Sequence, residues 1–466
     1  MGIRQFALRI VLLSFLIFAN CSPGQAVAEV SHDIEAVTNL ILVKELKILK
    51  LGIAIRKQTE SRKLSRERRF SLYALANSSL TSIGAFMSGA GRLHYANMPK
   101  KAPNNLFENA TIIRVIANGV GVGGVLLEAS KDAIDARKDR LARVDPKSAA
   151  KDVEVLNGEI VQLMKERSAL AAKLPETMHL QYQAEETFLA DMQDAVLTEF
   201  RALYVDVKGK KARRKMQLFL TGTSNLVSGG GSLYSGIIVP HKYKSNPIKR
   251  VRYGGVGGIT DIATGSLNIL TPFAVTGADI ATRRDAKAVL FRQLGAGDIG
   301  DLVRLKKQVA DFQVQGDTIL CSSTEIAARQ KAAAAVIGIL EKHKELNDQE
   351  RKHALEKLVR RVLDSGVDSS GSFSKVVNGI GTTVGAYRYT RNAHRRFLAT
   401  GRAGITYGIG NAIGVEEVIR DGVVRELRHY RAKGEHALVS QILDDELKLL
   451  DEAQLAIEKS GNATDR

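Results

Sequence analysis

The chain has 466 residues, enough for several modules or one repetitive architecture, yet it contains no Trp and only 5% aromatic residues. This composition argues against a large ligand pocket lined by aromatic rings. The 68 Lys and Arg residues outnumber the 50 Asp and Glu residues, and such an excess favours anionic partners such as phospholipid headgroups, acidic polysaccharides or nucleic acid.

The N-terminus has the pattern of a secretory signal peptide over residues 1–28. Two arginines precede an apolar run at 10–19, which is short for a membrane span, and small residues follow at 26–28. An uncleaved anchor and a lipoprotein modified at Cys21 are the alternatives. If the chain is cleaved after residue 28, Cys321 remains alone and no intrachain disulfide can form. We therefore expect an exported protein of the periplasm or cell envelope, for which nucleic acid is an unlikely partner.

Three Gly-rich stretches recur about 150 residues apart and predict internal repeats. Each first arm has a small or turn-prone residue seven positions before a glycine, and each is followed by a basic loop and a second Gly-rich arm. We predict an all-α fold of three degenerate repeats, each with amphipathic helices and one Gly/Ser-rich helical hairpin. The predicted units are 29–145 with hairpin 70–129, 146–295 with hairpin 216–277, and 296–466 with hairpin 373–417.

The stretch ANGVGVGGVLLEAS at 117–130 contains the G-x-G-x-x-G spacing of a dinucleotide-binding turn. The corresponding arms of the other two units lack this spacing, and a long helical pattern follows, whereas a dinucleotide site needs a βαβ unit. We therefore predict that these glycines allow helices to approach closely, as in the glycine-zipper segments that the arms resemble in a general way. The predicted helix-packing glycines are Gly84, Gly119, Gly121, Gly124, Gly222, Gly229, Gly265, Gly385 and Gly410.

Two first arms are long enough to cross a bilayer, since residues 70–91 and 216–239 carry no charge. The second arms, however, contain Arg114, Asp261 and Arg402, and a charge exposed to lipid costs several kcal/mol. Two interpretations stay open at this point. The hairpins pack as a soluble helical core, or they insert as paired or oligomeric hairpins with their small and polar faces together.

The three loops between the arms combine Lys and Arg with Tyr and His, as interfacial segments of membrane proteins do. Stacking on nucleic acid or sugar, and the ordinary exposure of hairpin ends, are the alternatives. The predicted residues that bind an anionic surface are Arg92, His94, Tyr95, Lys100, Lys101, His241, Lys242, Tyr243, Lys244, Lys249, Arg250, Arg252, Tyr253, Tyr387, Arg388, Tyr389, Arg391, His394, Arg395 and Arg396.

The segments between the hairpins are amphipathic and predict helical pairs or coiled coils. Apolar residues of 153–174 follow a heptad that Arg167 interrupts, and 435–459 has a second apolar stripe. These stripes favour packing within the chain, with a homo-oligomer as the alternative. The basic run KGKKARRK at 208–215 precedes an uncharged arm and marks either a membrane boundary or a solvated helix junction.

No metal-ligand spacing, nucleophile elbow or phosphate-binding loop is found in the sequence. We therefore expect a non-enzymatic protein without cofactor or metal. The first hypothesis is an envelope-associated scaffold that contacts anionic lipid or an envelope polymer through its basic hairpin tips. The alternatives are a membrane-inserting, pore-like or channel protein built from the hairpins, and an enzyme whose site forms only on folding.

Overall fold

The computed structural model describes residues 23–294, 304–308, 327–345, 370–435 and 438–463. Residues 1–22 of the predicted signal peptide, with Cys21, lie outside the described residues, as does Cys321. Every described element is a helix, so the predicted all-α class is confirmed. The stretch 117–130 lies inside one helix and is no dinucleotide-binding turn.

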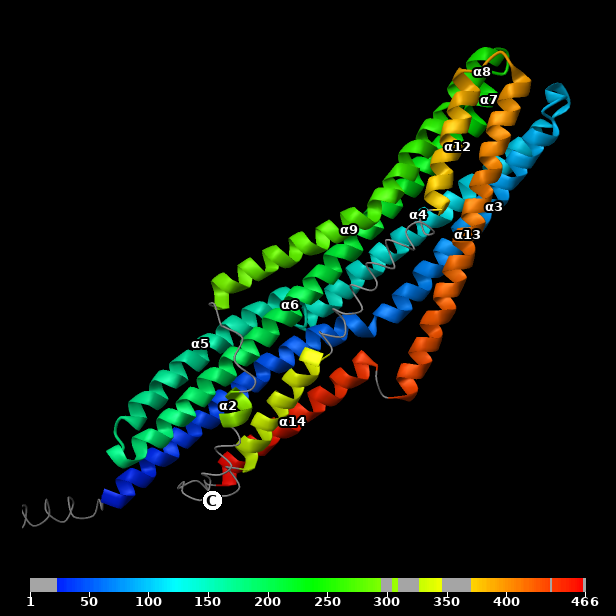
Figure 1. Cartoon of the computed structure of the whole chain (residues 1–466). Coiled ribbons are helices and arrows are strands. Elements are labelled where there is room, and N and C mark those ends of the chain that lie inside the picture. Colours follow the sequence, from blue (N-terminus) through cyan, green and yellow to red (C-terminus); the bar gives the residue numbers. More distant parts are fainter. Residues whose placement is uncertain (1–22, 295–303, 309–326, 346–369, 436–437, 464–466) are drawn as a thin grey trace, which may run out of the picture.

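The long helices are α2 (Pro23–Ser61), α3 (Lys63–His94), α4 (Asn104–Leu141), α5 (Pro146–Ala171), α6 (Glu176–Leu233), α9 (Val256–Leu294), α12 (Ser370–Tyr387), α13 (Ala393–Gly434) and α14 (Val439–Ala463). The short elements at the hairpin ends are η1 (Pro99–Lys101), η2 (Tyr234–Ile238), α7 (Val239–Lys242) and α8 (Pro247–Gly254). The molecule is elongated, with α7 and α8 at one end and the start of α2 and the end of α14 at the other (Figure 1).

One end of the molecule, here called the base bundle, consists of α2, α5, the first half of α6, α14 and the helical residues 327–345. Leu, Ile and Val side chains of these segments form one continuous buried core. Arg167, which interrupts the predicted heptad, is fully buried in it. Its guanidinium donates to Thr38 Oγ1 at 2.9 Å and pairs with Glu185. A buried cation is tolerated here because it is paired and hydrogen-bonded.

The base bundle also buries His343 between two carboxylates. Its Nδ1 lies 2.7 Å from Glu199 and its Nε2 lies 2.9 Å from Glu446. Burial favours the neutral imidazole, but the hydrogen bonds and charges of the two glutamates outweigh it and raise the pKa of His343 to about 9. His343 is therefore charged at neutral pH and joins α6, α14 and residues 327–345.

The other end of the molecule is a closed ring of six described helices, here called the six-helix ring. Its order is α3, α4, the second half of α6, α9, α12 and α13, and α13 packs back against α3. The ring consists of three hairpins, α3/α4, α6/α9 and α12/α13, whose connections lie at one end. The predicted hairpins 70–129, 216–277 and 373–417 lie within these helix pairs, which extend beyond the predicted limits. Their equivalence as internal repeats stays a prediction.

Glycines bring the helix backbones of the ring into contact. A Cβ on Gly89 of α3 would lie 2.7 Å from the backbone nitrogen of Ile405 in α13. A Cβ on Gly379 of α12 would lie 2.5 Å from the carbonyl oxygen of Gly258 in α9. No side chain fits at such distances, so the van der Waals contact between backbones offsets the low helix propensity of glycine.

Eight of the nine predicted packing glycines have close neighbours. Gly84 faces the carbonyl oxygen of Ala110, which a Cβ would approach to 2.8 Å, whereas most of the others face side chains of adjacent helices. The prediction is wrong for Gly119, because a Cβ there would meet nothing within 4 Å. Residues two apart on a helix point in nearly opposite directions. Since Gly121 points inward, Gly119 points outward.

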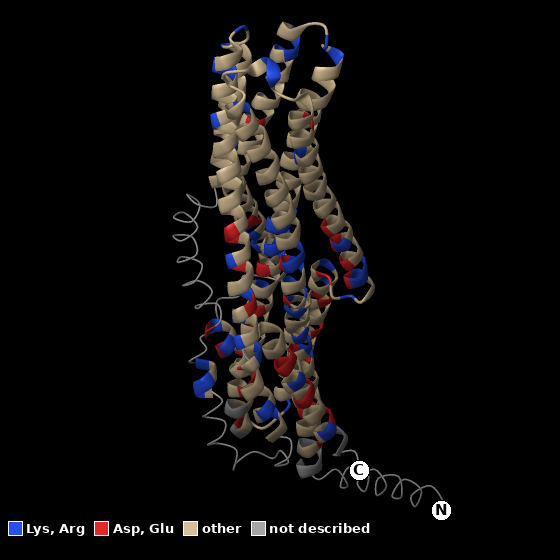
Figure 2. Cartoon of the chain, turned by 90° about the vertical axis from the view of Figure 1, so that its right-hand side faces the viewer, with Lys and Arg blue, Asp and Glu red and all other residues tan. Residues whose placement is uncertain are grey.

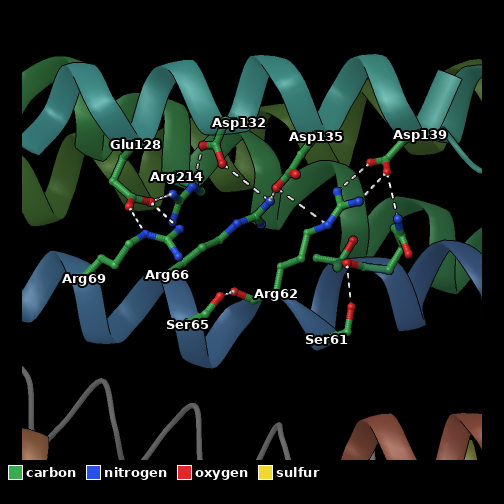
Figure 3. Close-up of polar contacts among 12 residues, drawn as sticks. Ser61, Arg62, Ser65, Arg66, Arg69, Glu128, Asp132, Asp135, Asp139 and Arg214 are labelled. Carbon is green, nitrogen blue, oxygen red and sulfur yellow. Dashed lines mark hydrogen bonds and ion pairs between the residues drawn. The ribbon is translucent and has the colours of Figure 1, made fainter. Parts of the chain in front are cut away.

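A ladder of ion pairs joins α3, α4 and α6 where the ring meets the base bundle (Figure 3). Arginines of α3 alternate with carboxylates of α4 along the interface. The pairs are Arg62 with Asp135 and Asp139, Arg66 with Asp132 and Asp135, and Arg69 with Glu128. Arg214, from the basic run at 208–215, completes the ladder by pairing with Glu128 and Asp132 at 2.6 and 2.5 Å. The ladder lies at the end of the uncharged arms that is nearer the base bundle, and it fixes the register of α3 against α4.

Candidate functional site

The interior of the six-helix ring contains two cavities that share no lining residue. The cavity near the hairpin ends, here called the tip cavity, measures about 470 Å³. The second, here called the asparagine cavity, measures about 300 Å³ and is lined by Asn77, Asn118, Asn225, Asn268 and Asn411. All six helices contribute to both, so the cavities follow one another along the axis of the ring.

A group of polar side chains, here called the central cluster, separates the two cavities. Arg114 of α4 donates to Asp261 of α9 at 3.1 Å, and Asn378 of α12 donates to the same carboxylate at 2.8 Å. The Arg114 guanidinium also lies over the ring of Tyr407 of α13, 5.4 Å from its centroid. The two charges neutralise each other, and the contacts join four different helices at this level.

A second bridge crosses the interior in the asparagine cavity. Asn77 Nδ2 of α3 donates to Asn225 Oδ1 of α6 at 3.2 Å, although α4 lies between these helices in the ring. The bridge passes over Gly121 of α4, where a Cβ would collide with the Asn225 amide. Gly121 therefore leaves room for polar groups to meet inside the ring.

The outer face of the ring is apolar, which reverses the usual arrangement of a soluble bundle. Phe273 is 70% exposed, Phe219 67% and Leu226 63%. Further exposed large apolar side chains are Leu72, Ile83, Phe86, Ile112, Ile116, Leu126, Leu127, Leu233, Ile259, Leu270, Phe373, Ile380, Ile409 and Ile413. None of them lines either cavity. All six helices thus turn large apolar side chains outward, whereas most residues that line the cavities are small or polar, with Phe107 and Phe397 among the exceptions.

Charged side chains are rare over most of the ring and dense in the base bundle (Figure 2). Within the arms, Arg114 and Asp261 face the interior, and Lys375 lines the asparagine cavity. Arg402 of α13 is exposed, as is Glu416 near the end of the same arm. An arginine side chain at this position can extend along the helix toward the charged hairpin ends.

The three basic loops meet at the far end of the ring. His394 Nδ1 lies 2.9 Å from the carbonyl of Ala96, which ties the third loop to the first. In the second loop, the rings of Tyr243 and Tyr253 stack with centroids 4.9 Å apart.

Of the residues predicted to bind an anionic surface, four line the tip cavity instead: Arg92, Lys100, Arg250 and Arg396. The remaining predicted residues do not line it, and most are exposed: His94, Lys101, His241, Lys242, Lys244, Lys249, Arg252, Tyr253, Tyr387, Arg388, Arg391, His394 and Arg395. Tyr95, Tyr243 and Tyr389 are half-buried. Their contact with a surface stays a prediction.

The interior itself was missed by reasoning from the sequence alone. Arg114 and Asp261 counted as obstacles to membrane insertion, whereas the structure pairs them. One signal was present: two opposite charges stand alone in otherwise uncharged, Gly-rich arms, a pattern that indicates a buried polar partner. Which helices would bring them together could not be deduced.

No protein-family model, curated protein or solved structure matches the chain. Among the described residues, no group of three or more His, Cys, Asp or Glu side chains is placed to hold a metal ion. By length and composition, one described helical stretch, 104–171, could cross a membrane, with a best window of mean hydropathy 1.7. Since core helices of soluble proteins pass the same test, the distribution of side chains around the ring is the more informative observation.

Proposed function

We propose that the six-helix ring spans a lipid bilayer and encloses a polar conduit for small solutes, which makes the chain a pore-like membrane protein. The observation that carries this proposal is the reversed ring, with large apolar side chains outside and amides, hydroxyls and paired charges inside. In water, an apolar outer face of this extent is unfavourable. In a bilayer, it is the expected exterior.

The dimensions of the ring support this orientation. The 22 uncharged residues 70–91 of α3 rise by about 33 Å, close to the roughly 30 Å thickness of a hydrocarbon core. The ion-pair ladder lies below this zone. The basic loops with Tyr243 and Tyr253 lie above it, where aromatic rings and cations suit the headgroup layer. The base bundle then lies on one side of the membrane and the hairpin ends on the other.

The central cluster makes this conformation a closed one. Solutes that enter the tip cavity meet the Arg114–Asp261 pair before they reach the asparagine cavity. Conduction therefore requires these side chains to part. The Asn77–Asn225 bridge is a second contact that must open.

A pair of variants tests the orientation against a soluble scaffold. Leu226 on the ring and Leu427 on the charged part of α13 are 63% and 64% exposed. A lipid-facing Asp costs about 2.5–3.5 kcal/mol near the centre of a membrane helix, whereas an exposed Asp in water costs little. Leu226→Asp should therefore abolish membrane insertion, and Leu427→Asp should leave it intact.

The measurement is flotation of the full chain with liposomes, followed by alkaline carbonate extraction and planar-bilayer conductance. Wild-type protein should resist extraction and produce discrete current steps. A soluble scaffold that binds through its basic tips would instead be released by carbonate, would bind in a salt-sensitive manner and would tolerate both substitutions equally. That result would refute the conduit.

A further inference from the structure

The tip cavity has an excess of positive charge that its own side chains do not neutralise. Among the described lining residues are five cationic side chains and one carboxylate: Arg92, Lys100, Arg114, Arg250, Arg396 and Asp261. Asp261 pairs with Arg114. Within the part of the chain that the structure describes, none of the other four cations forms an ion pair with a carboxylate.

The positions of these cations are set by contacts that leave their charge uncompensated. The Arg92 guanidinium lies over the ring of Phe107, 5.6 Å from its centroid. Arg396 Nη1 donates to the carbonyl oxygen of Thr390 at 2.8 Å. Arg92 is repelled by the charges of Arg114 and Arg396, and Arg396 by that of Arg250. Four cations that line one cavity without a carboxylate partner of their own favour an anion among them.

The surroundings favour an oxyanion over a simple point charge. Guanidinium groups present several N–H donors in a plane and match the oxygens of phosphate or sulfate. Hydroxyl groups of Ser88 and Thr382 line the same cavity and add further donors. The volume of about 470 Å³ holds a small hydrated anion.

We propose that the tip cavity binds a free, small tetrahedral oxyanion such as inorganic phosphate, and that the conduit of the proposed function therefore admits anions at this end. The inference rests on the proposed function for its role in passage. Binding itself can be measured whether or not the ring conducts.

The test is calorimetric titration of inorganic phosphate into the full-length protein in a phosphate-free detergent. The double variant Arg92→Gln/Arg396→Gln should weaken binding at least about tenfold, since each charge-assisted hydrogen bond contributes more than a neutral one. Exposed arginines at the base end of α4 provide a matched control with the same change in charge. The variant Arg137→Gln/Arg140→Gln should bind phosphate as the wild type does.

Each outcome bears on the proposal. Wild-type protein that fails to bind at millimolar phosphate, or equal weakening in both double variants, overturns the site. If the double variant loses its helical circular-dichroism signal, Arg250→Gln at the rim takes its place, and unchanged affinity there also overturns it. Binding in detergent that phosphatidylglycerol nanodiscs suppress would assign the site to a headgroup and refute the free oxyanion.

The two proposals fail separately. Current steps without phosphate binding would remove the anion site and leave the conduit. Phosphate binding by a protein that carbonate extracts would remove the conduit and leave the site.

Discussion

The contact between α9 and α12 provides a quantitative test of the glycine packing, through Gly379→Ala. The added methyl would lie 2.5 Å from the carbonyl oxygen of Gly258 and 2.7 Å from the backbone nitrogen of Ile262. Backbone atoms cannot rotate away as a side chain does, so the helices must separate. Overpacking of this kind costs about 1–3 kcal/mol.

The matched control is Gly119→Ala on the outer face of α4, where the methyl meets nothing within 4 Å. Both substitutions gain about 1 kcal/mol of helix propensity, so the difference between them isolates the packing term. Thermal unfolding of the full chain in detergent, followed by circular dichroism at one scan rate, measures it. A domain of about 150–250 residues, the size range of the six-helix ring, loses about 2–4 °C per kcal/mol. The Gly379→Ala variant should therefore unfold roughly 2–12 °C below the Gly119→Ala variant.

Equal unfolding temperatures for the two variants would refute the reasoning. Such a result would mean that α9 and α12 can separate without loss, and the ring would then be a loose assembly. A larger loss in Gly119→Ala would show instead that its face is covered by another molecule.

Three further predictions concern single side chains, all measured by thermal unfolding. The folded pKa of His343 is about 9, against an ordinary value of 6.5. Protonated His343 therefore stabilises the fold by about 3 kcal/mol below pH 6.5, and this stabilisation is lost as the pH rises through 9. His343→Gln should remove that pH dependence, and an unchanged pH profile would contradict the assignment. Asp261→Leu should destabilise the ring by about 3–5 kcal/mol because Arg114 is left unpaired. Adding Arg114→Leu should restore most of the lost stability, whereas additive losses would argue against the pair. Glu45 is fully buried, neither of its carboxylate oxygens is hydrogen-bonded to a described residue, and burial raises its pKa. Glu45→Met should therefore stabilise the base bundle by about 1–3 kcal/mol at neutral pH. A loss of stability would indicate a partner for the carboxylate.

The helical class could be predicted because periodicity and small-residue patterns are local properties of the sequence. The heptad around Arg167 predicted a buried stripe, and the helical pattern that follows Gly124 predicted a helix over 117–130. Local pattern also misplaced Gly119, since the G-x-G-x-x-G spacing alone does not say which glycine faces a neighbouring helix.

The ring and its interior could not be predicted for a different reason. Pairing Arg114 with Asp261, or Asn77 with Asn225, requires knowledge of which hairpins are neighbours and in which order they close. That order depends on backbone contacts such as the one between Gly89 and Ile405, which join residues more than 300 positions apart. A single sequence contains no signal for such contacts beyond the presence of glycine.

Helix α6 has 58 residues and runs without interruption for about 87 Å from the base bundle into the ring. It therefore acts as a rigid strut shared by both parts of the molecule. A tilt of α6 imposed on the base bundle is transmitted to Asn225 and to the helices beside it. In the proposed membrane orientation, a mechanical or ligand-driven rearrangement of the base bundle would in this way alter the interior of the ring, without any flexible linker between the two.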